Sequence, residues 1–268
     1  MTSSDAVAPD ATAEPNVIVI TGGGRGIGAA TARRLAADAV DTGTRIHLVV
    51  NYTSDERSAQ AVVDEATSPD GLVTAGAVGA DISAEADVTR LFAAADETGR
   101  LTGLVNNAGI VQPIGPFVDL DPARLERTWA VNITGAFLCA REAVRRMSTA
   151  SGGAGGSIVN VSSRAASFGS PNEFIDYAAS KGAVDTMTVG LAAEVAARGI
   201  RVNAVRPGLI DTDIHADAGY PDRVTALGGN VPMGRGGTAA EVANLIAWLL
   251  SDEASYVTGA LMDIGGGR

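Results

Sequence analysis

Short apolar runs alternate with longer segments of helical periodicity along most of this chain. Each early run of Val, Ile and Leu is followed by a segment whose apolar residues recur every three to four positions. These patterns predict strands at 17–21, 46–51 and 73–78 and helices at 27–39, 55–67 and 85–98. Strands joined by crossover helices form a parallel sheet that is covered on both faces, which explains why the runs are continuously apolar. The sequence therefore predicts an α/β fold with a doubly wound parallel β-sheet.

The same pattern continues to the end of the chain and is interrupted once by a long connection. It predicts a strand at 104–106, helical segments between 122 and 148, a strand at 158–161, a helix at 177–197, a strand at 202–205, a helix at 239–250 and a strand near 261–264. Residues 209–235 are too long for a simple turn and predict a substrate lid. Residues 16–268 are expected to form a single domain, and the small, acidic residues 1–15 a flexible N-terminal tail.

Composition excludes several classes of function. Asp and Glu number 31 against 20 Lys and Arg, and the net charge of −11 disfavours binding to nucleic acid or to a membrane surface. The single cysteine, Cys139, lies in a predicted helix and is expected to be a buried apolar residue. His47 and His215 lack the spacing of metal ligands, so no metal is expected. No signal peptide or membrane span is predicted, which favours a cytoplasmic protein.

A glycine-rich turn follows the first predicted strand and opens the first helix. Its candidate cofactor-binding residues are Thr21, Gly22, Gly24, Arg25, Gly26, Ile27 and Gly28. Glycines permit a tight turn and a close approach of backbone to ligand, while the start of the helix faces a pyrophosphate. In this strand-turn-helix context the motif predicts dinucleotide binding.

The end of the second predicted strand indicates which dinucleotide is bound. NAD enzymes of this type place a carboxylate about 20 residues past the turn to hold the ribose 2′-hydroxyl. Here the strand ends in Asn51 and Tyr52, with Ser54 close behind, so the expected carboxylate is missing. Arg25 is able to pair with a 2′-phosphate, and the three neutral side chains offer hydrogen bonds to the same group. We therefore expect NADP(H) to be preferred over NAD(H).

One lysine stands among the 20 basic residues, and its position indicates a reactive site. Lys181 follows Tyr177 by four residues in a predicted helix, so both side chains project from one face. An ammonium group beside a phenol favours the phenolate and is expected to lower the phenol's pKa toward neutrality. A group that gives and takes a proton in this way suits the interconversion of carbonyl and alcohol.

Together with further motifs, these residues resemble the short-chain dehydrogenase/reductase family. The motifs are the turn at 21–28, Asn-Asn-Ala-Gly at 106–109, Val-Asn-Ile-Thr-Gly at 131–135, Val-Ser-Ser at 161–163, Tyr-Ala-Ala-Ser-Lys at 177–181 and Arg-Pro-Gly-Leu-Ile-Asp-Thr at 206–212. The resemblance extends from about residue 16 to the last residue. It implies a Rossmann fold, a homotetramer and four catalytic residues. These are Tyr177 as general acid/base, Lys181 as its electrostatic partner, a serine holding the substrate oxygen, and Asn132 anchoring a water.

The catalytic serine is either Ser162 or Ser163. They precede Tyr177 by 15 and 14 residues, and the commonest family spacing is one shorter than the latter. We choose Ser163 and accept a one-residue insertion. The resemblance also implies cofactor contacts from Asp81, Ile82, Asn107, Ala108, Gly109, Tyr177, Lys181, Pro207, Gly208, Ile210 and Thr212. Candidate substrate contacts are Pro113, Asn172, Phe174, Ile175 and His215.

These patterns predict an NADP(H)-dependent oxidoreductase that transfers a hydride between nicotinamide and a carbonyl or secondary alcohol substrate. Three alternatives stay open at this point. They are a non-catalytic NAD(P)-sensing protein, an NAD(H)-dependent sugar or alcohol dehydrogenase, and a dehydratase or epimerase with internal hydride return. A sensing protein has no need of Tyr177 and Lys181, and this chain has both. The small-molecule substrate itself does not follow from the fold.

Overall fold

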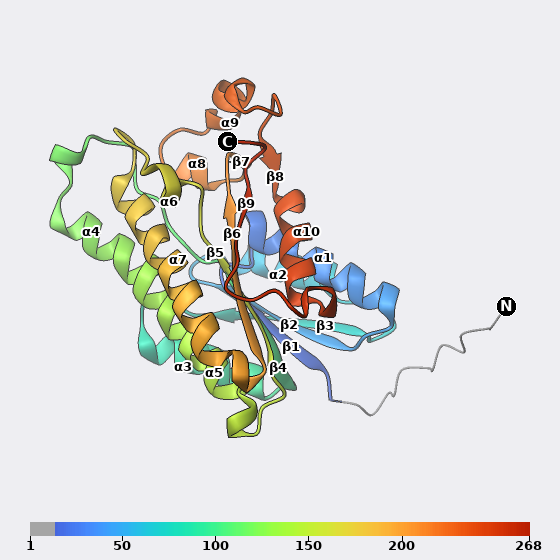
Figure 1. Cartoon of the computed structure of the whole chain (residues 1–268). Helices are drawn as coiled ribbons and strands as arrows, with labels where there is room; N and C mark the ends of the chain where they lie inside the picture. Colours follow the sequence, from blue (N-terminus) through green and yellow to red (C-terminus); the bar gives the residue numbers. More distant parts are fainter. Residues whose placement is uncertain (1–13) are drawn as a thin grey trace.

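A seven-stranded parallel sheet forms the centre of the protein, whose computed structural model describes residues 14–268. The strand order is β3-β2-β1-β4-β5-β6-β9 (Figure 1). The strands are β1 (Asn16–Ile20), β2 (Ile46–Tyr52), β3 (Val73–Gly79), β4 (Arg100–Asn106), β5 (Gly156–Val161), β6 (Ile200–Pro207) and β9 (Leu261–Ile264). Residues 1–13 of the expected tail lie outside the described residues, whereas the Pro15 carbonyl accepts a hydrogen bond from the Arg100 amide at 3.1 Å.

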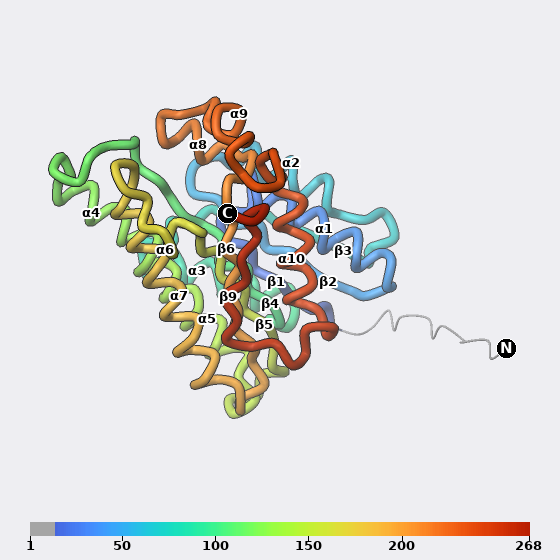
Figure 2. Tube along the Cα trace, turned by 45° about the horizontal axis from the view of Figure 1, so that its top comes forward, coloured from blue at the N-terminus to red at the C-terminus, as the bar shows by residue number. Residues whose placement is uncertain are grey.

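Helices cover both faces of the sheet, which confirms the predicted doubly wound fold. The layer of α1 (Gly26–Thr42), α2 (Glu56–Ala66) and α10 (Ala239–Leu250) packs on one face. The opposite layer consists of α3 (Glu85–Asp96), α5 (Ala136–Met147) and α7 (Ile175–Val195), with α4 (Pro122–Trp129) beside α7. Figures 1 and 2 show the two layers on either side of the strands. Each face has its own core of Val, Ile, Leu and Ala side chains.

The strand order reverses between β1 and β4. From β3 the chain returns to the far side of β1, so β1 pairs with β2 on one edge and with β4 on the other. At such a reversal the loops leaving two neighbouring strands diverge and open a crevice at the carboxyl ends of the strands. The fold therefore places a binding site beyond Ile20 and Asn106, the last residues of β1 and β4.

The starts of the helices are capped differently. Asp55 and Asp121 accept backbone hydrogen bonds at the starts of α2 and α4, and Thr238 with Glu241 forms a capping box on α10. Helix α1 begins after Arg25 without any side-chain cap. Its first amide groups therefore lack side-chain acceptors and are free to bind an anion.

Two irregular segments flank the site end of the sheet. Between α4 and α5, residues Ala130–Gly135 form a π-helical turn inside what the sequence predicted only as helical. The predicted lid segment contains the short strand β7 (Ile210–Asp211), which pairs with β8 (Gly237–Thr238), and the short helices α8 (Ile214–Asp217) and α9 (Arg223–Leu227). A further short helix, α6 (Ala165–Phe168), follows β5. In Figure 1, α8 and α9 lie above the carboxyl ends of β6 and β9.

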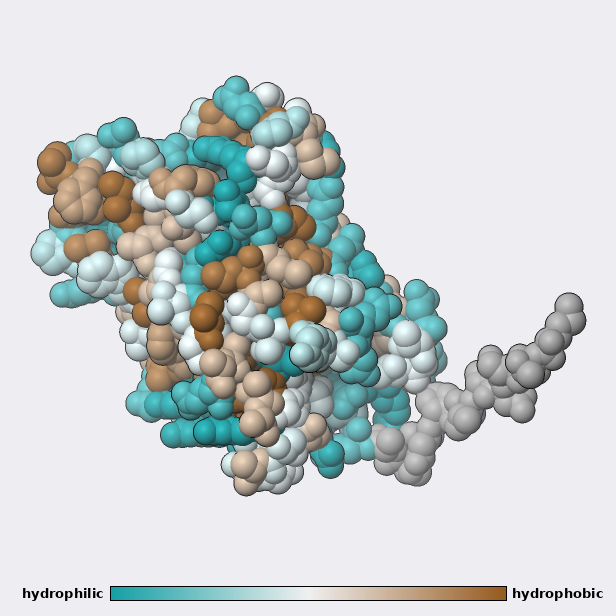
Figure 3. All heavy atoms as spheres, in the orientation of Figure 1, coloured by the Kyte–Doolittle hydropathy of each residue, from teal (hydrophilic) through white to brown (hydrophobic). Residues whose placement is uncertain are grey.

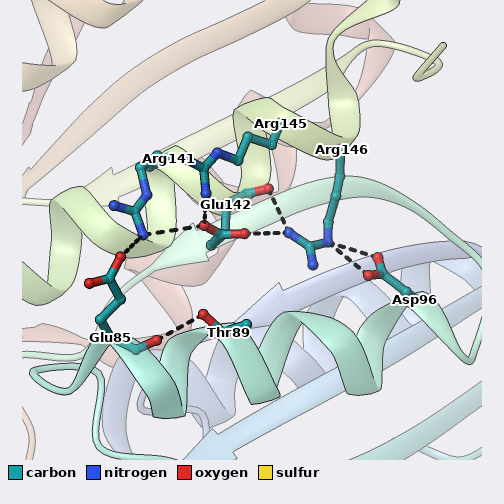
Figure 4. A network of polar contacts seen from close by, with 7 residues as sticks. All are labelled: Glu85, Thr89, Asp96, Arg141, Glu142, Arg145 and Arg146. Atoms are coloured by element: carbon teal, nitrogen blue, oxygen red, sulfur yellow. Dashed lines mark hydrogen bonds and ion pairs between the residues drawn. The ribbon is translucent and has the colours of Figure 1, made fainter. Parts of the chain in front are cut away.

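A charged cluster around Glu142 joins α5 to α3 away from the site (Figure 4). The buried Glu142 carboxylate accepts hydrogen bonds from Arg145 at 2.6 Å and from Arg146 at 2.7 Å. Arg146 also reaches Asp96 on α3, and Arg141 reaches Glu85 at its start. Burial works to raise the pKa of Glu142, but the arginines hold it below its usual value.

Among residues 14–268, no helix is both long and apolar enough to pass through a membrane.

Candidate active site

A cavity of about 660 Å³ lies at the carboxyl ends of the strands. Its walls come from the turn after β1, the ends of β2, β4, β5 and β6, the start of α7, and the lid segment. A volume of this size is in the usual range for ligand sites. The reversal of strand order therefore opens onto a cavity large enough for a cofactor and a substrate.

The glycine turn forms the floor of one side of this cavity. Gly22 and Gly26 have φ angles of +61° and +53°, which other residues rarely adopt. A Cβ on Gly28 would lie 2.4 Å from the Gly22 carbonyl oxygen, so no side chain fits between α1 and the turn. Gly24, Arg25 and the uncapped start of α1 face the cavity. This cradle of backbone amides fits a pyrophosphate.

Thr21 and Gly28, two of the predicted cofactor contacts, lie beneath the cavity and are not among the residues that line it. The buried Thr21 hydroxyl accepts the amides of Asn107 at 2.9 Å and Ala108 at 3.0 Å. The Asn107 side chain donates in return to the carbonyls of Thr21 and Gly22. These bonds fasten the end of β4 to the turn and fix the shape of the floor.

The Asn51 side chain, a predicted contact of the cofactor's 2′ group, makes several hydrogen bonds within the protein. Its Oδ1 accepts the Gly22 amide at 3.2 Å. Its Nδ2 lies 3.0–3.2 Å from the carbonyl oxygens of Tyr52, Val78 and Ala80. Asn51 lines the cavity, and its hydrogen bonds hold the turn against β2 and β3.

The edge of the cavity beyond β2 carries opposite charges. Tyr52 and Ser54 line it as predicted, together with Asp55, which the sequence reasoning missed. The Asp55 carboxylate caps α2 by accepting the amide of Ser58 at 3.0 Å and its hydroxyl at 2.6 Å. Arg25 pairs with Asp217 of α8 at 2.5 Å, so it bridges the turn and the lid segment.

Tyr177, Lys181 and Ser163 meet at the cavity wall formed by β5 and α7. The Lys181 Nζ lies 5.6 Å from the centroid of the Tyr177 ring and donates to the Val161 carbonyl at 2.7 Å. The Ser163 hydroxyl lies beside the Tyr177 phenol and acts to lower its pKa. Ser162 turns the other way and donates to the Lys181 carbonyl at 3.2 Å. Of the two candidate serines, Ser163 is the one beside the phenol.

Burial dominates the acid-base properties of this pair. It raises the pKa of Tyr177 to about 12, although Ser163 works to lower it. Burial also lowers the pKa of Lys181 to about 8, against the opposite effect of Asp185. The expectation that the ammonium lowers the phenol's pKa is therefore wrong for this structure, because desolvation of the phenolate outweighs that attraction. At neutral pH the phenol keeps its proton and is a proton donor.

Asn132 lies behind the cavity wall in the π-helical turn and does not line the cavity. Its side chain accepts the Ile110 amide at 2.8 Å and donates to the Ile110 carbonyl at 2.9 Å. It also donates to the hydroxyl of Ser180, which lies between Tyr177 and Lys181 on α7. Asn132 thus ties the loop after β4 to the helix that carries the reactive pair.

The other predicted contacts divide into two groups. The following predicted contacts line the cavity: Ile27, Asp81, Ile82, Asn107, Ala108, Gly109, Pro207, Gly208, Ile210, Thr212, Phe174 and His215. Three substrate candidates do not line it, namely Pro113, Asn172 and Ile175. Pro113 is exposed and its carbonyl accepts a bond from Arg124, Asn172 is exposed in a turn with φ of +61°, and Ile175 begins α7 on another side. In the described part of the chain, no group of His, Cys, Asp or Glu is arranged to hold a metal ion.

Sequence reasoning missed several polar residues on the substrate side of the cavity. They are Arg164, Ser170, Asp217, Arg223 and Arg268. They lie in loops, in short helices and at the last residue, where no apolar period or motif indicates which way a side chain points. For all of them except Arg268, the one available signal was their location in the loop before Tyr177 or in the predicted lid segment.

Comparisons with known proteins agree with this site. The sequence profile of the family described as Enoyl-(Acyl carrier protein) reductase matches residues 22–268. The chain is 50% identical over 253 residues to the uncharacterized oxidoreductase YgfF of Escherichia coli (strain K12), covering 94% of this chain and 99% of that protein. The chain belongs to the short-chain dehydrogenase/reductase family. It is also 40% identical over 262 residues to cis-4-hydroxycyclohexanecarboxylate dehydrogenase of Sinomonas cyclohexanicum, covering 94% and 95% of the two chains.

A similar solved structure contains a nicotinamide cofactor. The crystal structure of 3-ketoacyl-(acyl-carrier-protein) reductase from Brucella melitensis complexed with NADH matches with a TM-score of 0.83 and 33% identity, over 95% of this chain and 98% of that one. As a short-chain dehydrogenase/reductase, this protein is an oxidoreductase that uses a nicotinamide cofactor and acts on alcohol or carbonyl groups. The glycine cradle and the uncapped start of α1 fit that cofactor.

Proposed function

We propose that this short-chain dehydrogenase/reductase interconverts a carbonyl compound and a secondary alcohol with NADP(H), with Tyr177 as the general acid and base. The observation that carries the proposal is the contact of Ser163 with Tyr177, beside Lys181, on the wall of the cofactor cavity. When bound, the nicotinamide supplies or accepts the hydride. The chain's own residues have to bind the substrate oxygen and move its proton.

The geometry assigns a separate task to each residue. The Ser163 hydroxyl holds the substrate oxygen beside the phenol, and Tyr177 donates its proton to that oxygen in the direction of reduction. The raised pKa of Tyr177 suits this donor role, because burial keeps the phenol protonated at neutral pH. Lys181 places an ammonium against the ring and stabilises the phenolate that forms. Asn132 holds the loop after β4 and helix α7 in fixed relative positions. We also propose that Asn132 anchors a water that relays protons.

The cofactor preference rests on the edge beyond β2. Arg25 is more than half exposed there, and Tyr52 and Ser54 stand beside it. The nearby Asp55 carboxylate is occupied in capping α2, so it competes little for a ribose hydroxyl. An arginine beside neutral hydroxyl groups favours a 2′-phosphate over a 2′-hydroxyl. We therefore propose NADP(H) over NAD(H), with reduction as the direction in the cell.

Replacement of Tyr177 by Phe tests the proposed mechanism. The variant keeps the ring but removes the proton, so we expect turnover to fall by about 10²–10⁴-fold. The dissociation constant of NADPH should stay within about twofold, because the glycine cradle is untouched. Steady-state reduction of a panel of ketones and aldehydes, with NADPH fluorescence titration, measures both quantities. Tyr256→Phe is the control, since Tyr256 is fully exposed. Wild-type turnover in the Tyr177→Phe variant would refute the mechanism.

We also propose a homotetramer, which the surface supports. Phe137 on α5 and Val189 on α7 are nearly half exposed, on the helices that the family resemblance places between subunits. Strand β9 ends the sheet and pairs with β6 on one side only. Apolar side chains gather over β9 and α10 in the middle of Figure 3. An exposed strand edge with an apolar surround is a surface that proteins usually cover. Sedimentation of the wild type and of Phe137→Asp tests the assembly.

A further inference from the structure

Two buried polar atoms without a partner lie on the substrate side of the cavity. Among residues 14–268, a small set of buried side-chain nitrogen and oxygen atoms has no hydrogen-bond partner. Of these atoms, Ser170 Oγ and Arg223 Nη1 belong to residues that line the cavity. Both residues are more than nine-tenths buried. Buried donors of this kind are unfavourable unless something binds them.

Arg223 is held in place by contacts that leave one nitrogen of its guanidinium free. It begins α9, and its Nη2 donates to the Glu173 carboxylate at 2.7 Å. The guanidinium carbon lies 5.2 Å from the centroid of the Phe174 ring and 5.9 Å from that of Tyr220. Glu173 is about one-third exposed, so the pair is open to water on the acid's side and buried on the arginine's side. The position of the guanidinium is fixed, and its Nη1 has no acceptor.

Two partly buried arginines in the described part of the chain each donate twice to one carboxylate, in contrast to the single bond of Arg223. Arg124 grips Asp176 with two nitrogens at 2.8 and 3.0 Å. Arg206 donates to Asp185 through Nε at 3.0 Å and Nη2 at 2.8 Å. Both pairs join elements of the frame and have no further task. A buried guanidinium that makes a single bond to a partly exposed acid keeps binding capacity for an anionic group.

The Phe174 ring lies between the Arg223 guanidinium and the Tyr177 ring and contacts both. Phe174 stacks edge-on against Tyr177 with ring centroids 5.6 Å apart, and the Arg223 guanidinium lies against the same Phe174 ring. His215 lines the cavity nearby, where burial lowers its pKa and the charge of Arg223 lowers it further. His215 Nε2 donates to the Ile210 carbonyl at 2.8 Å, and this bond works against the lowering of the pKa. A substrate oxygen at Tyr177 and an anionic group at Arg223 are thus separated by about the width of one aromatic ring and its contacts.

We propose that the substrate of this enzyme carries a carboxylate remote from its reacting carbon, and that Arg223, with the Ser170 hydroxyl, binds it. Phe174 forms the apolar wall along the intervening carbon atoms. This inference rests on the proposed function, and it names the substrate class: hydroxy acids and keto acids whose two functional groups are separated by a short apolar segment. Arg223 is the residue that determines specificity for the acid.

Binding of simple carboxylates tests this assignment without any turnover. Calorimetric titration of the enzyme saturated with NADP⁺ compares cyclohexanecarboxylate and hexanoate with their primary amides. We expect each carboxylate to bind about tenfold or more tightly than its amide, the effect of one charge-assisted bond. Arg223→Gln should abolish that difference. Arg235→Gln is the matched control, because Arg235 has the same charge in the same segment but is exposed and paired with Glu241. Equal or undetectable binding of acid and amide to the wild type overturns the proposal, and so does an equal loss in Arg235→Gln.

A second variant keeps the test informative if Arg223→Gln folds poorly. Glu173→Gln removes the acid that now shares the guanidinium, and its side chain is partly exposed. We expect it to tighten carboxylate binding several-fold and to leave amide binding unchanged. Weaker or unchanged carboxylate binding in a folded Glu173→Gln variant contradicts the role of Arg223.

Turnover separates this inference from the function on which it depends. The probes are 3-oxobutanoate, 4-oxopentanoate and 5-oxohexanoate, each against its methyl ester. Preference for the acid at one chain length, lost in Arg223→Gln, supports the inference. Turnover of the esters without any preference for the acids refutes the carboxylate site and leaves the proposed reduction standing. If neither acids nor esters, nor the neutral ketone panel, are reduced with NADPH or NADH, the proposed function fails, while the calorimetric result still decides the role of Arg223.

Discussion

The two sides of the cavity are held together by different kinds of contact. On the side of the glycine turn, backbone meets backbone at close range, and the buried amides of Asn51 and Asn107 tie the strand ends together. On the side of the lid segment, the main links are ion pairs between side chains. Arg25 to Asp217 is one, and Arg223 to Glu173 is the other. The first side is closely packed, whereas on the second side the Arg25–Asp217 pair is open to water and the Arg223–Glu173 pair is buried on the arginine's side.

This difference bears on how freely each side is able to vary. A turn that must admit a pyrophosphate has one backbone solution, so its residues follow from geometry. Exposed ion pairs contribute only about 0–1 kcal/mol, so the lid can rearrange around ligands of different shape at little cost. Under the proposed function, the turn side binds the cofactor and the segment at 209–235 contacts the substrate.

The largest expected effect comes from adding a side chain on the turn side. Gly28→Val places a Cβ 2.4 Å from the Gly22 carbonyl oxygen and 2.8 Å from the Asn107 side chain. We expect a loss of stability of about 1–3 kcal/mol from overpacking and, because the turn must move, loss of cofactor binding by about 100-fold or more. Thermal melting and NADPH fluorescence titration measure the two effects.

A glycine on the lid side is the control for this variant. A Cβ on Gly229 meets nothing within 4 Å and its φ is not in the left-handed region. Gly229→Ala should therefore leave both melting temperature and cofactor affinity unchanged. Tight cofactor binding by Gly28→Val would contradict the contrast between the two sides, since it would show that the glycine turn can also adapt to an added side chain.

The next largest effect concerns the buried ammonium group of Lys181. Lys181 donates to the Val161 carbonyl and is 4% exposed. Its pKa is lowered by burial from 10.5 to about 8, so between these values the unfolded chain binds more protons than the folded one. Stability from this group therefore rises with pH across that window and is reduced below pH 8, by about 3 kcal/mol.

Lys181→Met removes this dependence and is expected to be inactive. The free energy of unfolding of the wild type, minus that of the variant, should increase by about 3 kcal/mol as the pH rises from 8 to 10.5. Urea unfolding at a series of pH values measures the difference. Arg198→Met is the control, because an exposed guanidinium stays charged throughout that window. A flat difference for Lys181→Met would mean that the ammonium is not desolvated.

The turn side was more predictable from sequence than the lid side, for a physical reason. Runs of Val, Ile and Leu, the glycines at 22–28 and the four-residue spacing of Tyr177 and Lys181 act locally, so their pattern predicts the strands, the turn and the shared helix face. The hydrogen bonds of Asn51 could not be predicted from the sequence, because they reach residues 27 and 29 positions away, on β3 and in the turns that follow β1 and β3. Nothing local shows that an amide is already satisfied.

The lid side depends on contacts that only the folded chain brings together. Arg223 meets Glu173 across 50 positions, and Arg25 meets Asp217 across 192. The pKa of Tyr177 was also predicted in the wrong direction, since the spacing to Lys181 is visible in the sequence but the burial of the phenol is not. Burial and unpaired polar atoms are properties of packing, and they carry the information about substrate and proton transfer.

The smallest expected effect lies in the link between the two sides. Asp217→Asn breaks the pair with Arg25, whose two side chains are about half exposed, so stability should change by less than about 1 kcal/mol. The freed Arg25 should bind a 2′-phosphate better. We expect NADPH affinity to rise about two- to fivefold at low salt, the rise to shrink at high salt, and NADH affinity to stay the same. Arg25→Gln should weaken NADPH alone.

Asp213→Asn provides the matched control, because it removes the same charge from the same cavity wall without touching the Arg25 pair. If Asp213→Asn tightens NADPH as much as Asp217→Asn, the gain reflects the overall field of the cavity and Arg25 has no special role. Should both variants tighten NADH and NADPH equally, the preference for NADP(H) would be refuted at this edge. Only a selective response of NADPH to the Arg25 and Asp217 pair means that the lid side, through one exposed ion pair, also tunes the cofactor that the turn side binds.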